Sequence, residues 1–328
     1  MADYLLEVKD LKTWFHTFKG VVKAVDGVSF ALKRGEILGI VGESGGGKSI
    51  TGFSILKLIG PPGRFDGGEV WFEGEDLLQK SEQEMQNIRG NKISMIFQDP
   101  MTALNPLYTI AQQIEETLRQ HQPGLPAAER RARAVELLRK VGIPSPEARL
   151  KDYPHQFSGG MRQRVIIAIA LAMSPALIIA DEPTTALDVT VQAQIIRLLT
   201  ALVREKNTAL ILITHDLALV SEVVDKILVM YCGKIVESGT VPDILERTAH
   251  PYTAGLLNSI PRLAGEPRRL EQIPGMVPSP FDLPPGCKFA PRCPRRQPLC
   301  ETREPETFAV NAGHEAACFF PVGGEKNE

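Results

Sequence analysis

The residues that most narrowly dictate chemistry occupy positions 42–49 and read Gly-Glu-Ser-Gly-Gly-Gly-Lys-Ser, directly after an apolar run at 37–41. Glycines let a backbone wrap closely around an anion, so that successive N–H groups point at phosphate oxygens. In such a loop Lys48 contacts the β- and γ-phosphates and the Ser49 hydroxyl is a Mg²⁺ ligand. A plain glycine-rich turn is the alternative. The residues expected to contact nucleotide are Gly42, Ser44, Gly45, Gly46, Gly47, Lys48, Ser49 and Ile50.

Two carboxylates, Asp181 and Glu182, follow a second apolar run at 177–180. Asp181 is placed to hold Mg²⁺, directly or through water. Glu182 can act as a general base on the attacking water. An acidic strand end facing solvent is the alternative, and the phosphate loop earlier in the chain argues against it.

The elements that must position these groups alternate between strands and helices. Alternation of this kind predicts a mainly parallel α/β core. Short alternating strands precede it between residues 5 and 30, and a helical region interrupts it between about 107 and 155. The expected later strands are 69–74, 93–97, 176–180, 209–214, 226–230 and 234–238, and the expected later helices are 164–173, 191–204 and 217–224.

Composition excludes several classes of protein. The chain has 328 residues, 43% of them hydrophobic and 23% charged, as in a globular protein with a sizeable core. Its 37 basic and 39 acidic residues give a net charge of −2, so no global basic field favours nucleic acid. The longest apolar stretch, 165–173, is about half of what a membrane span needs. No secretory signal is visible, and a cytosolic location is expected.

The eight residues 157–164, Phe-Ser-Gly-Gly-Met-Arg-Gln-Arg, resemble the signature motif of ABC-transporter ATPase subunits, and they precede Asp181 as that family requires. Gln98 resembles the family's Q-loop, Asp188 its D-loop and His215 its switch histidine. The methionine at 161, where the family often has glutamine, leaves the phosphate-facing residues intact.

An aromatic residue stacks on adenine in this family. Phe15 lies at the corresponding position, and Trp14 and Phe18 compete with it.

The resemblance implies an ABC-type P-loop ATPase. Residues 1–248 would form a RecA-like parallel core with an N-terminal antiparallel β subdomain and a helical subdomain at about 100–160. The implied catalytic residues are Lys48, Gln98, Glu182 and His215, and the implied Mg²⁺ ligands are Ser49, Gln98 and Asp181. Ser158, Gly159, Gly160 and Asp188 would serve ATP bound to a partner subunit, so that two ATPase subunits close around two nucleotides.

Three stretches resemble the dipeptide and oligopeptide importers in particular: 97–106, 181–190 and the His-Pro-Tyr-Thr at 250–253. The resemblance implies a second, related ATPase, two transmembrane permease subunits and an extracytoplasmic solute-binding protein. It implies a peripheral position at the cytoplasmic face of the inner membrane. Nickel or another small solute is an alternative cargo. An ABC ATPase acting on nucleic acid is the alternative function, disfavoured by the charge and by the short interval between Gln98 and Ser158.

Four of the five cysteines, Cys287, Cys293, Cys300 and Cys318, lie in the last 42 positions, after a proline-rich stretch at 261–285. Clustered thiols in a cytosolic chain favour a metal site over disulfides. Zn²⁺ and an iron–sulfur cluster are both open, although no tight zinc knuckle occurs. The importer resemblance implies a [4Fe–4S] cluster in an irregular C-terminal extension, 249–328.

Overall fold

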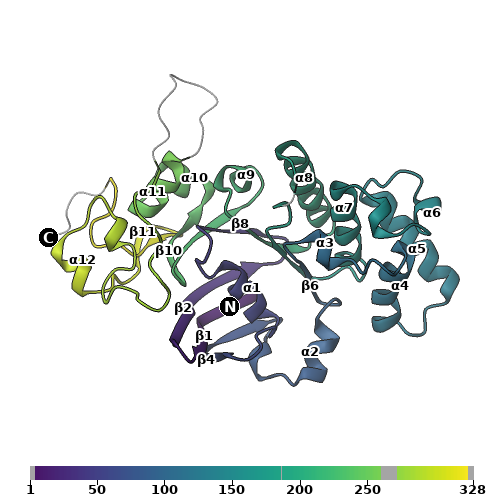
Figure 1. Cartoon of the computed structure of the whole chain (residues 1–328), viewed down its shortest axis with the longest axis horizontal. Helices are drawn as coiled ribbons and strands as arrows, with labels where there is room; N and C mark the ends of the chain where they lie inside the picture. The colour runs from purple at the N-terminus through teal and green to yellow at the C-terminus, as the bar shows by residue number, and fades with distance from the viewer. Residues whose placement is uncertain (1–3, 186, 260–271, 324–328) are drawn as a thin grey trace. The chain divides into compact units, whose positions relative to one another are not determined.

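The structure is a computed structural model that describes residues 4–185, 187–259 and 272–323 (Figure 1). The chain forms two compact units from interleaved segments. Residues 32–37 and 79–213 make one, here called the helical unit. The described parts of residues 2–31, 38–78 and 214–328 make the other, here called the phosphate-loop unit.

The N-terminal part of the phosphate-loop unit is an antiparallel sheet in the order β2-β1-β4-β5. A register irregularity between Lys9 and Lys12 lets Leu11 and Thr13 continue the buried face that Leu6 begins. The strands are β1 (Tyr4–Thr17), β2 (Gly20–Lys33), β4 (Gly63–Phe72) and β5 (Glu75–Asp76). This sheet is the antiparallel β subdomain that the resemblance implied.

The same unit contains five further strands in the order β11-β12-β10-β9-β3. They are β3 (Ile37–Val41), β9 (Lys226–Tyr231), β10 (Lys234–Thr240), β11 (Phe308–Asn311) and β12 (His314–Ala316). Strand β3 is buried throughout and runs parallel to β9, whereas β10 pairs antiparallel with β9 and with β12. The helices are α1 (Lys48–Ile55), α9 (Leu217–Ser221), α10 (Val241–Glu246), α11 (Pro251–Asn258) and α12 (Pro298–Thr302), with the 3₁₀ turn η3 (Ala290–Arg292).

The helical unit contains the parallel strands β8 (Ala209–Thr214), β7 (Leu177–Asp181) and β6 (Ile93–Ile96), with β7 in the middle. Helix α4 (Ile110–His121) begins at a Thr109–Gln112 capping box and packs on α5 (Ala127–Lys140) and α7 (Gly159–Ala170). The remaining helices of this unit are α2 (Glu82–Ile88), α3 (Pro100–Ala103), α6 (Pro146–Arg149) and α8 (Val189–Glu205), with the 3₁₀ turn η2 (Pro154–Gln156). The 3₁₀ turn η1 (Leu77–Gln79) begins in the phosphate-loop unit and ends in this one.

Two differences from the sequence predictions have clear physical reasons. Helix α7 begins at Gly159 rather than at 164, because the Ser158 side chain accepts the Met161 N–H and caps the helix. The tail is less irregular than expected, because β11 and β12 form a hairpin that extends the sheet beyond β10. Residues 260–271 of the proline-rich stretch lie outside the described residues, and 272–285 contain no helix or strand.

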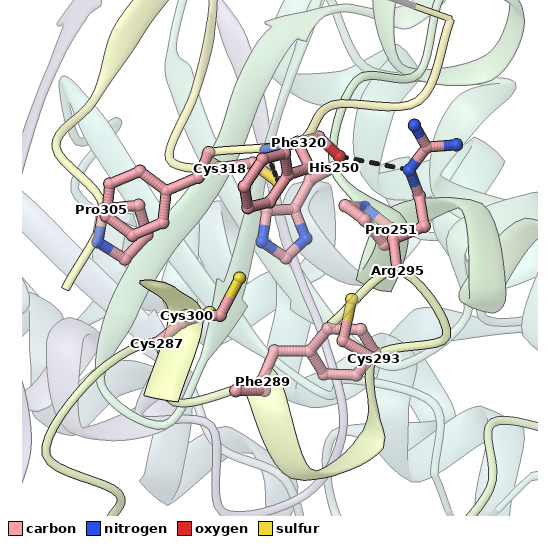
Figure 2. A pocket seen from close by; sticks show the side chains of 12 residues that line it. His250, Pro251, Cys287, Phe289, Cys293, Arg295, Cys300, Pro305, Cys318 and Phe320 are labelled. Atoms are coloured by element: carbon pink, nitrogen blue, oxygen red, sulfur yellow. Dashed lines mark hydrogen bonds between the residues drawn. The ribbon is translucent and has the colours of Figure 1, made fainter. Parts of the chain in front are cut away.

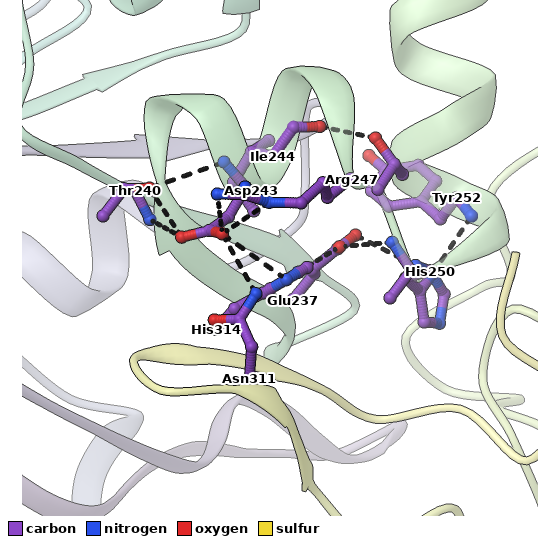
Figure 3. A network of polar contacts seen from close by, with 11 residues as sticks. Glu237, Thr240, Asp243, Ile244, Arg247, His250, Tyr252, Asn311 and His314 are labelled. Atoms are coloured by element: carbon purple, nitrogen blue, oxygen red, sulfur yellow. Dashed lines mark hydrogen bonds and ion pairs between the residues drawn. The ribbon is translucent and has the colours of Figure 1, made fainter. Parts of the chain in front are cut away.

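Buried polar contacts attach this hairpin to the rest of its unit (Figure 3). His314 Nε2 lies 2.8 Å from Glu237 Oε1, and both side chains are fully buried. The same carboxylate accepts the N–H groups of Ala249 and His250 at 2.6 and 3.0 Å. Asn311 donates to Asp243 at 3.2 Å. The hairpin is therefore held by β10 and by the first turn of α10. In the described part of the chain, no helix has the length and apolar character that crossing a membrane requires.

Candidate functional site

The phosphate loop joins β3 to α1 and keeps its lysine inside the loop. The Nζ of Lys48 donates to the carbonyl groups of Gly42 at 2.8 Å and Glu43 at 3.0 Å. Helix α1 begins at Lys48, so its first N–H groups and the positive end of its dipole face the loop. A buried ammonium group beside the positive end of a helix is suited to bind a polyphosphate.

Two glycines allow the loop to approach its neighbours closely. At Gly42, where φ is +148°, a Cβ atom would lie 2.2 Å from the carbonyl oxygen of Met230. At Gly47, where φ is +96°, it would lie 2.3 Å from the carbonyl oxygen of Ala24. No other residue fits either position without a shift of the backbone. Glycine is therefore required at these two positions because the loop packs closely on β9 and β2, as well as because phosphate must approach the loop backbone.

The carboxylate pair lies in the helical unit, at the end of β7. Asp181 is buried, and Glu182 follows it with a φ of +43°. The structure brings Gln98 to this pair: its Nε2 donates to Glu182 Oε2 at 3.0 Å, although 84 residues separate them. Thr185 Oγ1 donates to the same oxygen at 2.9 Å. Two donors thus hold the carboxylate that the sequence assigns as general base.

The signature residues lie at the start of α7, as their predicted role requires. Helix α7 has 12 residues, and its N-terminal turn contains Gly159 and Gly160. A Cβ atom on Gly160 would lie 2.9 Å from Val191 Cγ1 in α8, so a larger residue would press on that helix. Asp188 caps α8 by accepting the Val191 N–H at 3.0 Å. Both helix starts are therefore fixed by short side chains.

The aromatic candidates for adenine stacking differ in exposure. Phe15 is half-buried in β1 with the edge of its ring beside Gly63. Trp14 is covered by Lys23, whose Nζ lies 4.4 Å from the ring centroid. Phe18 is 96% exposed.

His215 is exposed directly after β8 and belongs to the phosphate-loop unit, as the phosphate loop itself does. The carboxylate pair and the signature residues belong to the helical unit. The predicted site residues therefore fall into two sets, one in the phosphate-loop unit and one in the helical unit.

The four tail cysteines, spread over 32 positions, line one small cavity together with His250 and Phe289 (Figure 2). Figure 2 shows the sulfur atoms of Cys293 and Cys300 turned toward its interior. Burial raises the pKa of the Cys287 and Cys293 thiols, and it raises that of Cys318 to about 12. The neighbouring thiols raise these pKa values further, which places the group within electrostatic reach of one another.

Backbone N–H groups also point at these sulfur atoms. Phe320 donates its N–H to Cys318 Sγ at 3.4 Å, and nearby backbone N–H groups lower the pKa of the Cys287 and Cys293 thiols against the effect of burial. Such donors favour the thiolate form, which is the form that binds metal. Among the described residues, no set of three or more Cys, His, Asp or Glu side chains is compact enough to hold a single metal ion.

Sequence reasoning missed the partners of Glu43, the second residue of the phosphate loop. Arg292 binds its carboxylate with two nitrogen atoms, at 2.5 and 2.9 Å. Tyr252 Oη accepts its backbone N–H at 2.8 Å. The His-Pro-Tyr string at 250–252 was noticed as a resemblance, but no pattern in the sequence indicates that its tyrosine, or an arginine 249 positions away, contacts the loop.

Comparisons with known proteins agree with this geometry. The family model described as "ABC transporter" matches residues 25–185, and that described as "Oligopeptide/dipeptide transporter, C-terminal region" matches residues 236–300. The solved dimeric ATP-binding cassette MJ0796, in a post-hydrolysis state with ADP and Pi, aligns with a TM-score of 0.65 and 30% identity, over 72% of this chain and 98% of that one.

Curated relatives match over almost the full chain. The oligopeptide transport ATP-binding protein AppD of Bacillus subtilis is 51% identical over 96% of each chain. The dipeptide transport ATP-binding protein DppD of Escherichia coli is 49% identical over 97% of each, and the oligopeptide transport ATP-binding protein OppD of Salmonella typhimurium is 50% identical over 98% of this chain and 95% of that one. The chain therefore belongs to the family of ATP-binding subunits of oligopeptide and dipeptide ABC transporters.

Proposed function

We propose that this chain hydrolyses ATP to power the import of dipeptides or oligopeptides across the cytoplasmic membrane. The observation that carries the proposal is the complete set of ATPase groups in a chain that matches peptide-transport relatives from end to end. The alternative cargo, nickel or another small solute, keeps the same ATPase role. The alternative of an ABC ATPase acting on nucleic acid finds no support in the names of these relatives.

The residues of the phosphate loop bind the nucleotide. Lys48 neutralises charge on the β- and γ-phosphates, and the loop N–H groups with those of α1 bind the phosphate oxygens. Ser49, Gln98 and Asp181 would hold Mg²⁺, which supplies charge neutralisation at the phosphates. Their oxygen donors suit that ion.

Glu182 accepts the proton of the attacking water. Gln98 holds its carboxylate through the 3.0 Å hydrogen bond and so restricts its orientation. His215 contacts the γ-phosphate from the phosphate-loop unit. The start of α7, with Ser158, binds the γ-phosphate of ATP held by a second subunit, and Asp188 contributes to the same interface.

The expected partners are a second, related ATPase, two permease subunits and an extracytoplasmic solute-binding protein. The solved MJ0796 cassette is itself dimeric, which supports a two-subunit ATPase. The segment 101–108 would receive a helix of the permease, and two of its side chains are open to a partner: Leu107 is 79% exposed and Tyr108 is 46% exposed. The chain would act as a peripheral subunit at the cytoplasmic face of the membrane.

We further propose that residues 1–248 form the ATPase domain, with a helical subdomain at about 100–160, and that 249–328 form an extension holding a [4Fe–4S] cluster. Four thiols around one cavity, with an N–H donor at Cys318, are the observation that supports such a cluster. A single tetrahedral Zn²⁺ ion would need sulfur atoms about 3.8 Å apart, given Zn–S bonds near 2.3 Å. The described residues contain no group of ligands that compact, which disfavours zinc as the alternative. Cys287, Cys293, Cys300 and Cys318 would each ligate one iron of the cluster.

The ATPase proposal is tested with Glu182→Gln, which keeps the shape of the side chain but cannot accept a proton. Steady-state hydrolysis should fall by at least about 100-fold, whereas ATP binding should persist. The matched control is Glu147→Gln, at an exposed glutamate that pairs with Arg139 on the surface, which should leave turnover unchanged. Equal turnover in Glu182→Gln and wild type would refute the assignment.

The cargo is tested by uptake in a strain that lacks the gene. Labelled dipeptides and oligopeptides should enter when wild-type protein is restored and not when Glu182→Gln is restored. Restored uptake of nickel without that of peptides would overturn the peptide assignment.

The cluster is tested by anaerobic purification followed by iron and sulfide analysis. Cys300→Ser should abolish the cluster signal. Cys232→Ser is the matched control, because Cys232 lies in the β9–β10 turn and does not line the cavity. Stoichiometric zinc without iron would refute the cluster.

A further inference from the structure

Every polar group of Glu43 has a partner, and two of its four partners, Arg292 and Tyr252, come from the C-terminal part of the chain. Its carboxylate is bound by Arg292, and its N–H donates to Tyr252 Oη. Its carbonyl oxygen accepts from Lys48 Nζ at 3.0 Å and from the Gly46 N–H at 3.2 Å. Glu43 therefore connects the catalytic lysine directly to residues far along the chain.

Arg292 is held rigidly enough to fix what it binds. The side chain is buried, and its Nε donates to the Pro274 carbonyl at 3.1 Å while Nη1 lies 3.3 Å from Tyr231 Oη. A planar guanidinium with two parallel bonds to one carboxylate fixes both the position and the orientation of that carboxylate. A lysine at this position would keep the charge and lose this geometry.

Tyr252 is fixed by an aromatic cluster. Its ring centroid lies 4.6 Å from that of Tyr231 and 5.3 Å from that of Phe289. A Cβ atom on Gly42, beside Glu43, would lie 3.5 Å from Tyr252 Oη, so the hydroxyl also lies close to Gly42. The hydroxyl therefore acts as a fixed acceptor for the loop backbone.

Both residues that hold Glu43 are close in sequence to residues that line the cysteine cavity. Arg292 precedes Cys293 in the chain, and Tyr252 lies two residues after His250, which lines the same cavity. Phe289, which packs on Tyr252, lines it as well. Short covalent links thus join the cavity walls to two residues that hydrogen-bond the phosphate loop.

We propose that Arg292 and Tyr252 are positioning residues for the phosphate loop, and that through them the cysteine-lined tail sets the affinity of this subunit for ATP. By holding Glu43, they keep the loop in its binding conformation before nucleotide arrives, which lowers the ordering cost of binding. Neither residue takes part in proton transfer, so their loss should weaken ATP binding and leave the chemical step unchanged. The proposal rests on the proposed function, because it assumes that this loop binds ATP.

The test uses the full-length protein with Tyr252→Phe and Arg292→Lys. We expect the Kd for a non-hydrolysable ATP analogue, and the KM for ATP, to rise about two- to tenfold for each, the range expected for one hydrogen bond. The kcat should stay within about twofold of wild type. The matched control is Arg296→Gln, which breaks an exposed ion pair with Glu301 in the same tail and should not change the Kd.

A double-mutant cycle distinguishes a positioning role of Arg292, exerted through Glu43, from a general contribution to folding. If Arg292 acts through Glu43, then Arg292→Gln should change the Kd far less in a Glu43→Gln background than in wild type. Additive effects would overturn the proposal, as would a Kd for Tyr252→Phe equal to that of wild type. Tyr252→Phe removes one hydroxyl, so it keeps the test decisive if the arginine variants do not fold. A wild-type protein that binds no ATP would instead refute the proposed function itself.

Discussion

His250 is expected to remain neutral in the folded protein at pH values where an exposed histidine is charged. Burial lowers its pKa from 6.5 to about 3. Its Nδ1 accepts the Tyr252 N–H at 3.0 Å, so the unprotonated Nδ1 is part of the cap of α11 (Figure 3). Protonation would add a buried charge and remove this acceptor.

The sign and size of the effect follow from this difference in pKa. Between pH 6.5 and about 3 the unfolded chain binds a proton at His250 that the folded chain does not. The contribution of this group is therefore constant above pH 6.5, and stability falls as the pH falls below it. At about pH 5, one and a half units lower, the loss is about 2 kcal/mol, since each unit is worth about 1.4 kcal/mol.

The variant His250→Asn isolates the contribution of His250 to the pH dependence of stability. The asparagine Oδ1 can accept the same N–H, asparagine is a favoured N-cap, and the side chain does not titrate. The chain has two tryptophans, Trp14 and Trp71, and both belong to the same unit as His250. Urea unfolding followed by tryptophan fluorescence therefore reports on that unit.

We expect wild type to lose about 2 kcal/mol more than His250→Asn between about pH 7.5 and pH 5. His155→Asn, at an exposed histidine, should show the wild-type pH dependence. The reasoning is refuted if wild type and His250→Asn lose equal stability over that range. It is also refuted if the histidine NMR signal missing from His250→Asn titrates near pH 6.5 in the folded wild type.

Three further predictions concern the nucleotide groups. Lys48→Ala removes two charge-assisted hydrogen bonds within the loop, and calorimetry should show ATP affinity reduced at least about tenfold; unchanged affinity would contradict the lysine's role. Gly47→Ala should lower the free energy of unfolding, measured by urea titration, by more than about 2 kcal/mol, because the strain of a positive φ costs about 1–2 kcal/mol and the new Cβ would also meet the Ala24 carbonyl. Gly45→Ala has nothing within 4 Å of the new Cβ and should show the strain alone. Ser158→Arg should leave this chain's own ATP binding intact in a filter assay and abolish hydrolysis at the partner's site, and loss of its own binding would argue against a shared site.

The sequence alone determined the features that depend on neighbouring residues. The string at 42–49 dictates a loop followed by a helix, since only glycine fits its backbone at Gly42 and Gly47 and since Lys48 reaches carbonyl groups five and six residues away. Ser158 and Asp188 each begin a helix because a short polar side chain can cap the N–H groups that follow it. The alternation of buried strands and helices predicted the α/β core for the same local reason.

Tertiary structure alone decided which distant residues meet. No periodicity indicates that Gln98 donates to Glu182 or that Arg292 binds Glu43. The clustering of the four tail cysteines predicted a shared site, but only the structure shows that all four line one cavity with His250 and Phe289. Such contacts depend on how strands are ordered in a sheet and where a tail hairpin is added to its edge, and a single sequence contains no local signal for strand order. Short stretches of sequence therefore specify the chemistry of the site residues, whereas long-range packing sets where those residues lie in the fold.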